Sequence, residues 1–431
     1  MKKIAKHKLV NRDKLVPQLR FEEGTENWNE LEYGEVYKFK KTNSLSRDKL
    51  NYESGLIKNV HYGDIHTKFS TGFKIDEEHV PYVNSDIDIS KIKEEDYCQE
   101  MDLIIADASE DYNDVGKSIE IIELNGEKLV AGLHTYIARP DPKRIVKGFG
   151  GYLVQSETIK RQVKILCQGS KVHGISKKNL SQVVFKIPSF PEQQKIADFL
   201  STVDKKIQAL SKKKELLETY KKGVMQKIFS QEIRFKKEDG SDYGEWEKKK
   251  LGELTKSYDG THSTPKYTVS GVPFYSVEHL TANQFSRTKF ISKEVWEQEN
   301  RRVKLERNDI LMTRIGSVGV SRLIDWDVQA SFYVSLALIK SSPNFESSYL
   351  DQFIKSDFFQ NELWKRTIHV AFPKKINLGE IGKCIVRLPE NAEQIKIASL
   401  LMALDDKIHL VANQIEKMKE WKKGLLQQMF V

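Results

Sequence analysis

Residues 188–229 read PSFPEQQKIADFLSTVDKKIQALSKKKELLETYKKGVMQKIF, and residues 389–430 read PENAEQIKIASLLMALDDKIHLVANQIEKMKEWKKGLLQQMF. The two stretches keep a constant register: Ile196 matches Ile397, a separation of 201 positions (397 − 196 = 201). Matched register over about forty residues indicates an internal duplication. This repeated stretch decides how the rest of the chain is organised.

Both copies are predicted to be long helices, because apolar residues recur at every seventh position along two seams. Two apolar seams at heptad spacing are typical of a coiled coil, so we expect the two helices to pair with each other. The alternative is that each helix packs only on its own globular domain. The predicted seam residues are Ile196, Leu200, Val203, Ile207, Leu210, Leu217, Val224 and Ile228 in the first copy, and Ile397, Leu401, Leu404, Ile408, Val411, Ile415, Met418, Leu425 and Met429 in the second.

In the first of these helices, one of the two apolar seams is interrupted by lysines, at Lys214 and Lys221. We expect the contact between the helices to loosen there or to rely on the aliphatic stems of the lysines. At 1.5 Å per residue, a helix of this length would be a rod of roughly 58 Å.

Composition places the chain among folded proteins with more than one domain. It has 431 residues, of which 39% are hydrophobic and 10% aromatic, and this length predicts two globular domains. No apolar run approaches the roughly 20 residues of a membrane span. Cys98, Cys167 and Cys384 are scattered without metal-ligand spacing, and the basic N-terminus lacks the apolar core of a signal peptide. We therefore expect a cytoplasmic protein without a metal site.

The formal net charge of +9 is compatible with a polyanionic partner but does not establish one. Residues 84–124 are acidic, so any contact of the first half with a nucleic acid must come from a local basic patch.

The duplication extends over the globular segments that precede the helices. LRF at 19–21 and IRF at 233–235 open the two segments, and Trp28 and Trp246 are each followed six positions later by glycine. We divide the chain accordingly into an N-terminal lead-in at 1–15, a first domain at 16–187, a first long helix at 188–230, a second domain at 231–388 and a second long helix at 389–431.

Inside each domain, short apolar runs predict strands and mixed patterns predict helices. Matched strands are expected at 101–109 and 308–317, and later strands at 132–138 and 330–339. A helix is expected at 151–163 and at 348–364, and a polar loop at 169–180 and at 366–378. A last strand ending in proline leads into each long helix.

The pattern EQxKIAxxLxxxDxKI…KKGxxQxxF after such a strand, present twice, resembles the specificity subunit of type I restriction-modification systems. DGTHSTPKY, VPFYSVEHL and NDILMTRIGSVG in the second domain support the resemblance. The first domain departs from the family pattern with NSLSRDKLNYES and IADASEDYND at the corresponding places. The resemblance covers nearly the whole chain from about Leu19 onward.

The resemblance implies an α+β fold: two similar globular target-recognition domains, each followed by a long helix, with the helices pairing as an antiparallel coiled coil in an internal pseudo-two-fold duplication. It also implies a non-catalytic DNA-specificity subunit, in which each domain recognises one half of a bipartite double-stranded DNA target and the helices set the spacing. Two modification (methyltransferase) subunits and restriction (endonuclease/translocase) subunits would be the protein partners. S-adenosylmethionine, ATP and magnesium would belong to those partners, and no cofactor to this chain.

Polar residues on loops are the candidates for DNA contact, because base edges are read by side-chain donors and acceptors and phosphates by Lys and Arg. For each of them a solvated loop position is the plainer interpretation, and a structural hydrogen bond is equally compatible with Glu278. In the first domain they are Asn43, Ser46, Arg47, Asn59, His61, Tyr62, Ser109, Tyr112, Lys171, His173, Ser176 and Lys177. In the second they are Thr261, His262, Ser263, Thr264, Lys266, Ser276, Glu278, Arg314, Ser317, His369, Lys374 and Lys375.

Two other functions remain as alternatives: a self-sufficient restriction enzyme or methyltransferase, and a helical interaction scaffold without a DNA role. The first is disfavoured because no amino-methyltransferase, phosphate-loop or zinc-protease motif is found. GFGG at 148–151 only superficially resembles a cofactor-binding loop, since it lacks the preceding strand and the downstream acidic residue. The second alternative explains the helices but not two diverged domains with polar loops.

Overall fold

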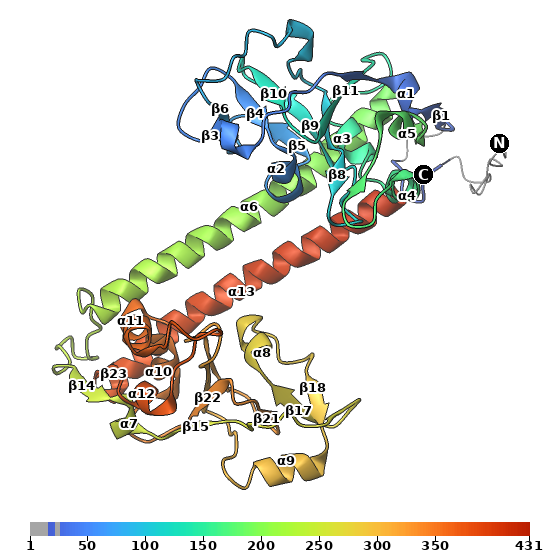
Figure 1. The fold of residues 1–431 in the computed structure, drawn as a ribbon. Helices are drawn as coiled ribbons and strands as arrows, with labels where there is room; N and C mark the ends of the chain where they lie inside the picture. Colours follow the sequence, from blue (N-terminus) through green and yellow to red (C-terminus); the bar gives the residue numbers. More distant parts are fainter. Residues whose placement is uncertain (1–15, 22–25) are drawn as a thin grey trace. The chain divides into compact units, whose positions relative to one another are not determined.

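The computed structural model describes residues 16–21 and 26–431, so the predicted lead-in lies outside the described residues. The chain forms two compact units, each combining one globular domain with parts of both long helices (Figure 1). Unit 1 comprises the residues before Lys212 together with Asn413–Val431, and unit 2 comprises Lys212–Ala412. Among the described helices, none has the length and apolar character needed to span a membrane.

Unit 1 contains thirteen strands and the first six α-helices of the chain. Its strands are β1 (Asn29–Glu32), β2 (Tyr37–Lys40), β3 (Leu50–Asn51), β4 (Lys58–Val60), β5 (Gly72–Lys74), β6 (Tyr82–Val83), β7 (Leu103–Ala106), β8 (Ala108–Ser109), β9 (Ser118–Glu123), β10 (Leu129–Ala131), β11 (Thr135–Pro140), β12 (His173–Gly174) and β13 (Val184–Ile187). Its helices are α1 (Tyr33–Val36), α2 (Tyr62–Thr67), α3 (Gly150–Leu153), α4 (Glu157–Leu166), α5 (Lys177–Ser181) and the start of α6 (Phe190–Phe229), with short 3-10 turns η1 (Arg47–Lys49) and η2 (Glu94–Asp96).

Unit 2 follows a similar order of elements, with fewer strands and with the helix α9 in addition. Its strands are β14 (Glu247–Lys250), β15 (Ser257–Asp259), β16 (Tyr267–Thr268), β17 (Val272–Tyr275), β18 (Lys289–Ile291), β19 (Ile310–Thr313), β20 (Ser321–Leu323), β21 (Ser331–Phe332), β22 (Leu336–Ile339) and β23 (Ile385–Leu388). Its helices are α7 (Leu251–Leu254), α8 (Val277–Thr281), α9 (Lys293–Glu299), α10 (Ser347–Ile354), α11 (Asp357–Arg366), α12 (Leu378–Gly382) and the start of α13 (Asn391–Gln428).

Each unit is built on two larger sheets and a two-stranded pair that joins its first and last strands. In unit 1 the sheets run β2-β11-β7-β9-β5 and β10-β4-β6-β3, with β1 antiparallel to β13; in unit 2 they run β15-β22-β19-β20 and β16-β18-β17-β21, with β14 antiparallel to β23. The predicted α+β fold class, with two domain-plus-helix units, is confirmed.

Two central strands, β7 and β22, are apolar at every position, and both of their faces are buried. In β7, Leu103 and Ile105 join the core that also contains α6 residues, whereas Ile104 and Ala106 join the core on the other side. A strand covered on both faces has no polar alternation. This explains why the sequence shows short continuous apolar runs at these places.

The helices expected at 151–163 and 348–364 were predicted as single elements, and this was wrong. Each is two helices, α3 and α4 or α10 and α11, separated by a serine that caps the second helix. The Ser156 hydroxyl accepts a hydrogen bond from the Ile159 N–H, and the Ser356 hydroxyl accepts one from the Phe359 N–H, both at 3.4 Å. A serine cap satisfies an N–H group that has no partner within the helix. The loops expected at 169–180 and 366–378 likewise overlap the short helices α5 and α12.

Within each unit, one end of α6 packs antiparallel to the opposite end of α13. In unit 1, Ile196 and Leu200 of α6 share a core with Leu425 and Met429 of α13. In unit 2, Ile228 of α6 shares a core with residues at the start of α13, including Ile397 and Leu401. The predicted seam residues are buried or half-buried throughout. The helices therefore pack on each other and on the domains, rather than on their own domains alone.

Two of the lysines on the seam, Lys221 and Lys422, form ion pairs between the helices, whereas Lys214 pairs with Glu218 within α6 at 2.9 Å. Lys221 Nζ lies 2.6 Å from Asp405 Oδ1 in unit 2, and Lys422 Nζ lies 2.7 Å from Asp204 Oδ1 in unit 1. The two ion pairs are equivalent in the repeat. Lys422 is the counterpart of Lys221 (422 − 221 = 201), and Asp405 is the counterpart of Asp204 (405 − 204 = 201). Burial lowers the pKa of Lys221, while Asp405 opposes that shift. Lys221 and Lys422 thus link the helices through their charge and not only through their stems.

A buried arginine–glutamate pair attaches each long helix to the beginning of its domain. Arg20 Nε and Nη2 donate to the two carboxylate oxygens of Glu192 at 2.7 and 2.8 Å. Arg234 Nε and Nη2 donate in the same way to Glu393 at 3.2 and 2.8 Å, and Trp246 Nε1 adds a third hydrogen bond at 3.0 Å. The glutamate of each EQ motif is therefore a structural anchor.

The glutamine of each EQ motif completes this attachment. Gln193 accepts a hydrogen bond from the Val146 N–H at 3.0 Å and donates to the Pro188 carbonyl at 3.0 Å. Gln394 accepts from the Glu346 N–H and donates to the Pro389 carbonyl, both at 2.9 Å. The repeated motif thus holds the start of a helix against the preceding strand and a loop of the domain.

Removal of the Arg234 guanidinium tests this anchor. Arg234→Met leaves the Glu393 carboxylate, which is 0% exposed, without its cation. Loss of one partner of a buried pair costs about 3 kcal/mol, and we expect the free energy of unfolding of unit 2 to fall by that amount, measured by calorimetry.

The matched control is Lys212→Met, which removes an exposed ion pair with Glu215. Exposed pairs contribute little to stability, so its melting temperature should stay near that of the wild type. Equal melting temperatures for both variants would contradict the anchoring role.

Candidate nucleic-acid interface

Two loops of unit 1 that are far apart in the sequence lie side by side, and we call them the paired loops of unit 1 (107–117 and 168–176). Ser109 pairs with His173 across β8 and β12, and the Ile175 N–H donates to the Asp107 carbonyl at 2.9 Å. The Tyr112 ring meets the His173 ring edge to face at 5.0 Å. The exposed Lys171 belongs to the same pair of loops, so four predicted DNA-contacting residues are brought together.

The equivalent loops of unit 2 are joined in the same way, and we call them the paired loops of unit 2 (314–318 and 366–376). The Ile376 N–H donates to the Arg314 carbonyl at 2.9 Å, and the Gly316 N–H donates to the Lys374 carbonyl at 2.8 Å. Lys375 forms bridges with Ile315 and Ile368. Ser317, His369, Lys374 and Lys375 are exposed on these loops.

The two pairs of loops share a backbone framework but carry opposite charge at its base. The Ile175 N–H donates to the carbonyl of Asp107 in unit 1, and the Ile376 N–H donates to the carbonyl of Arg314 in unit 2. The Asp107 carboxylate lies 3.3 Å from Nδ1 of His134. The two units therefore present different chemistry at equivalent positions.

Arg314 is held inside unit 2 by backbone carbonyls. Its guanidinium donates to the Val334 carbonyl at 2.9 Å and to the Ile376 carbonyl at 3.2 Å, and its side chain is 11% exposed. Burial lowers the pKa of Arg314, and Asp259 at 3.5 Å opposes that shift. In this position Arg314 stabilises the paired loops of unit 2 through hydrogen bonds to their backbone and to Val334.

Asp259 pairs with one further candidate of unit 2, His262, and with Arg302. Burial alone would raise its pKa, but His262 and Arg302 hold it below its ordinary value. His262 Nε2 lies 2.8 Å from one carboxylate oxygen, and Arg302 Nη1 lies 2.8 Å from the other. His262 remains exposed beyond this contact.

The other candidates of the second domain surround this network or cap a helix. Thr261 is buried and donates to the Ser263 carbonyl at 3.2 Å, and Thr264 lies 3.4 Å from the Tyr333 hydroxyl. Ser263 and Lys266 are exposed. Ser276 precedes α8 and donates to the Glu278 carboxylate at 3.1 Å. Glu278 thus has an internal hydrogen bond and an exposed side chain.

A second group of candidates in unit 1 is organised by Asp64. Arg47 donates from Nη1 and Nη2 to the Asp64 carboxylate at 2.7 and 2.9 Å, and Lys68 lies 3.0 Å from it. Burial alone would raise the pKa of Asp64, but Arg47 and Lys68 hold it below its ordinary value. Burial and the Arg47 charge lower the pKa of His61, which accepts a hydrogen bond from the Gly63 N–H and caps α2.

Amide and aromatic side chains extend this group toward the paired loops. Asn43 donates to Asn59 at 2.8 Å, and Asn59 itself is 0% exposed. Tyr62 is half-buried, with the His134 ring 5.4 Å away edge to face. The remaining candidates of this domain are held locally: Ser46 donates to Asp48, Ser176 caps α5, and Lys177 lies over the Tyr136 ring at 5.0 Å.

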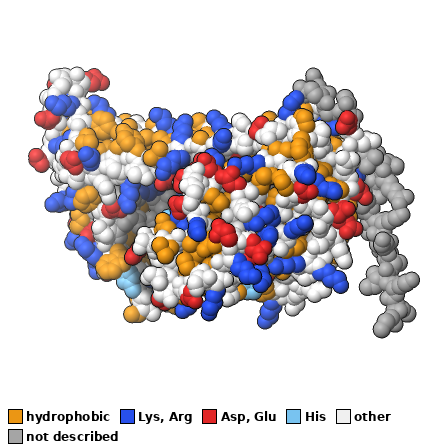
Figure 2. All heavy atoms as spheres, turned by 90° about the horizontal axis from the view of Figure 1, so that it is seen from above, with side chains coloured by type: hydrophobic (Ala, Val, Ile, Leu, Met, Phe, Trp, Pro, Cys, Tyr) orange, Lys and Arg blue, Asp and Glu red, His pale blue; other side chains and the backbone are white. Residues whose placement is uncertain are grey.

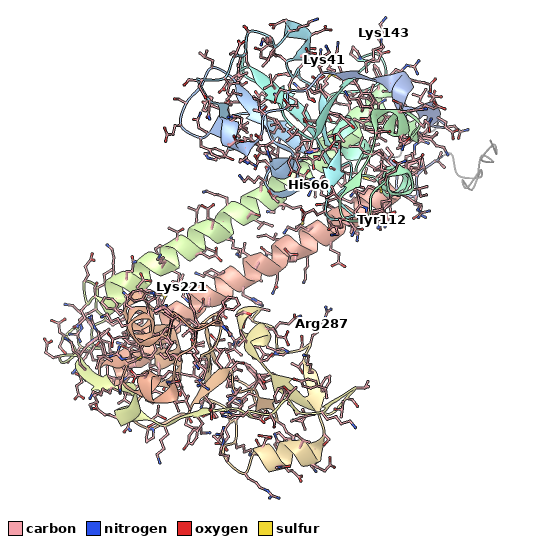
Figure 3. The ribbon with its side chains drawn as sticks, in the orientation of Figure 1. Lys41, His66, Tyr112, Lys143, Lys221 and Arg287 are labelled. Atoms are coloured by element: carbon pink, nitrogen blue, oxygen red, sulfur yellow. The ribbon has the colours of Figure 1, made fainter. Side chains whose placement is uncertain are left out.

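Four residues that sequence reasoning missed lie inside these networks: His66, His134, Arg302 and Asp259. His66 Nε2 is 3.2 Å from the Ala108 carbonyl, which places α2 against the paired loops of unit 1. Each becomes recognisable only through a contact with a distant segment, so no local pattern could have selected it. Tyr112 and His66 project from one edge of unit 1, whereas Lys41 and Lys143 lie at the opposite edge (Figure 3).

The face shown in Figure 2 is not uniformly basic. On the face shown in Figure 2, Lys and Arg side chains lie interspersed with Asp and Glu side chains. The candidate interface is therefore defined by the loops and their hydrogen-bonded framework.

A family model for the type I restriction modification DNA specificity domain matches residues 25–219 and again residues 243–420. The chain belongs to this family. Each match contains one domain and most of the long helix that follows it, in agreement with the duplication.

Two relatives are about one quarter identical to the chain over the aligned residues. A 24% identity to the type I restriction enzyme MjaVIII specificity subunit of Methanocaldococcus jannaschii covers 64% of the chain and 68% of that protein. A 26% identity to the putative type I restriction enzyme MjaX specificity subunit of the same organism covers 80% and 83%.

Solved structures show the same fold. The type I restriction-modification S subunit from M. genitalium superposes with a TM-score of 0.59 at 15% identity, covering 96% of the chain and 99% of that structure. A chain from work on complex assembly and conformational transition of the type I R-M system superposes with a TM-score of 0.54 at 14% identity, covering 94% and 97%.

In this member of the type I specificity family, the glycine-rich turn at 148–151 binds a carboxylate of its own domain. Glu120 on β9 accepts hydrogen bonds from the Gly148 N–H at 2.6 Å and from the Gly151 N–H at 2.7 Å. The side chain is 1% exposed, and burial raises its pKa from 4.5 to about 7, although both N–H groups oppose the shift. A buried acid at this turn disfavours a phosphate, and the described residues include no cluster of three or more His, Cys, Asp or Glu suited to a metal.

Glu120 predicts a pH-dependent contribution to the stability of unit 1. The folded state binds the proton more tightly than the unfolded state, so the free energy of unfolding should fall as pH rises through the interval between 4.5 and about 7. The fall attributable to this group is about 3 kcal/mol. Glu120→Gln should remove it, which urea unfolding at pH 5 and pH 8 would measure as the difference from wild type.

Glu77→Gln serves as the control, because Glu77 is exposed and paired with Lys74. Parallel pH profiles for the wild type and Glu120→Gln would show that the buried carboxyl does not change its proton affinity on folding.

Proposed function

We propose that the chain is a non-catalytic DNA-specificity subunit that recognises a bipartite double-stranded DNA target, one half-site per unit. The observation that carries this proposal is the pair of equivalent loop frameworks with different exposed side chains, Tyr112 and Lys171 in unit 1 and Ser317, Lys374 and Lys375 in unit 2. A shared framework places the loops alike, whereas different donors and acceptors select different bases. The names of the relatives in this family agree with it.

The long helices would set the spacing between the half-sites. They are continuous over 40 residues in α6 and 38 residues in α13. Half-sites read from one face of DNA lie about 34 Å or a multiple apart. A helix of this size, about 60 Å long, is sufficient to span that spacing.

Catalysis would belong to partner subunits. Two modification subunits would methylate adenine with S-adenosylmethionine, and restriction subunits would use ATP and magnesium, while this chain binds none of these groups and acts in the cytoplasm. A self-sufficient nuclease or methyltransferase and a scaffold without a DNA role are the competing functions, and neither accounts for two matched sets of paired loops.

Each unit has an exposed aromatic residue at the same position of the repeated helix, which would be a docking point for a modification subunit. Tyr220 on α6 is 60% exposed and Trp421 on α13 is 48% exposed, and they are counterparts in the repeat (421 − 220 = 201). Trp421 packs edge to face on Phe199 of α6 at 6.0 Å. Exposed aromatic residues are frequent anchors of protein interfaces, and one in each unit supports two partners.

Exchange of one domain for a copy of the other tests the half-site assignment. Residues 29–187 run from β1 to β13 and can be replaced by 247–388, which run from β14 to β23, leaving Arg20 and Glu192 in place. We expect the chimera, expressed with the complete system, to direct methylation to sites that contain the second half-site twice. Sequencing of methylated adenines in the cells gives the answer.

The reverse exchange, 247–388 replaced by 29–187, is the matched control and should duplicate the first half-site. A chimera that keeps both original half-sites, or changes both, would contradict the assignment of one half-site to each unit.

Truncation of the exposed aromatic residues tests the docking points. Trp421→Ala should weaken the binding of one modification subunit by about 2 kcal/mol, which is a roughly thirtyfold loss of affinity. The complex should then contain a single such subunit. Tyr220→Ala should have the same effect through unit 2, and the double variant should retain neither, as counted by mass photometry.

Lys213→Ala, an exposed change on α6, should leave two subunits bound. Circular dichroism must show unchanged helix content for Trp421→Ala because of its contact with Phe199. Full assembly of the double variant would rule out these two residues as docking points.

A further inference from the structure

The tip of one paired loop in unit 2 carries two apolar side chains without packing partners. Val370 is 97% exposed and Phe372 is 103% exposed, so both are as open to solvent as in an extended chain. A single exposed apolar residue is ordinary on a protein surface. Two such residues at one tip, both in a loop proposed to face DNA, indicate a site that binds a ligand.

The base of this loop is rigidly attached although its tip is free. Lys375 is bridged to Ile368 and Ile315, and the Lys374 carbonyl accepts the Gly316 N–H at 2.8 Å. His369 Nε2 lies 2.9 Å from the Trp364 carbonyl. The framework therefore holds Phe372 in a defined place without using it for folding.

The charges beside the tip favour a polyanion over a protein partner. Residues 369–375 read HVAFPKK, with two lysines directly after the tip and no acidic residue. Lys374 and Lys375 are exposed, as contacts to phosphates require. An apolar tip next to two cations matches the arrangement of stacked bases next to a phosphate backbone.

Unit 1 carries a smaller version of the same feature. Val172 is 52% exposed at the equivalent loop and lies between Lys171 and His173 in the sequence. The feature recurs at the place where the two units share their backbone framework, although the surrounding side chains differ.

We propose that Phe372 is a wedge that enters between two base pairs of the second half-site and partly unstacks them. Apolar side chains, phenylalanine included, are used in this way by proteins that kink DNA. Lys374 and Lys375 would hold the adjacent phosphates. The proposal rests on the proposed DNA-specificity function and adds to it a means of reading the sequence through its deformability.

This wedge has a consequence for specificity. Pyrimidine–purine steps unstack more readily than other steps, so a wedge selects for such a step even where no side chain contacts a base edge. The second half-site should therefore contain one position that tolerates base changes only when they preserve an easily opened step.

The experiment uses duplexes selected from a random-sequence pool by binding to the full chain. Each duplex is then rebuilt with a single mismatch at successive positions, because a mismatch removes part of the stacking that a wedge must break. Affinities of the wild type and of Phe372→Ala are measured by fluorescence anisotropy. Leu56→Ala is the control, since Leu56 is 86% exposed and precedes β4, at the end of that strand opposite His61.

The wedge requires the wild type to bind one mismatched duplex several-fold more tightly than the matched duplex. Phe372→Ala should bind the matched duplex about tenfold more weakly, lose the preference for the mismatch and still distinguish selected from scrambled duplexes. Leu56→Ala should behave as the wild type. Because Phe372 has no packing contacts, its truncation should leave the melting temperature unchanged.

Equal affinities of Phe372→Ala and wild type for the matched duplex would overturn the wedge while leaving the DNA-specificity function intact. The same holds if Phe372→Ala binds DNA normally but fails to retain a modification subunit, which would make the tip a protein-docking element. Failure of the wild type to enrich any duplex would overturn the DNA-specificity function itself.

Discussion

The structure depends on a buried arginine–glutamate pair at the start of each long helix. The arginine precedes the domain and the glutamate follows it, so that Arg20 meets Glu192 and Arg234 meets Glu393 across 172 and 159 positions of sequence. A carboxylate with no exposure, such as that of Glu393, is tolerated only when it is paired and hydrogen-bonded. The two ends of each domain must therefore meet at the helix, whatever the loops between them contain.

The second constraint acts between the helices, where lysines take positions that a coiled coil usually gives to apolar residues. Lys221 with Asp405 and Lys422 with Asp204 form the same ion pair in each unit. Tyr152 and Gln352 hydrogen-bond to these aspartates from the domains, both at 2.9 Å. Such pairs are satisfied in one register only, so they specify how the helices align more than they stabilise the fold.

These two constraints separate the framework of the protein from its recognition loops. The framework is repeated, down to backbone hydrogen bonds such as those that Ile175 and Ile376 donate across the paired loops. The side chains on it are not repeated: Asp107 lies with His134 in one unit, and Arg314 lies with Asp259 in the other. Such a division lets the loops differ between the two units without disturbing the anchored helices.

The sequence by itself determined the duplication, the two long helices, the apolar central strands and the family, because heptad and strand periodicities are local and register is visible by inspection. Only the tertiary structure decided that each predicted domain helix is broken at Ser156 or Ser356, and that the EQ motif binds Arg20 or Arg234. It alone revealed which loops are neighbours and brought His66, His134 and Arg302 into their networks. The serine caps at Ser156 and Ser356 are local contacts. The arginine–glutamate pairs and the loop networks arise from contacts between segments tens to hundreds of residues apart, whose geometry no local pattern encodes.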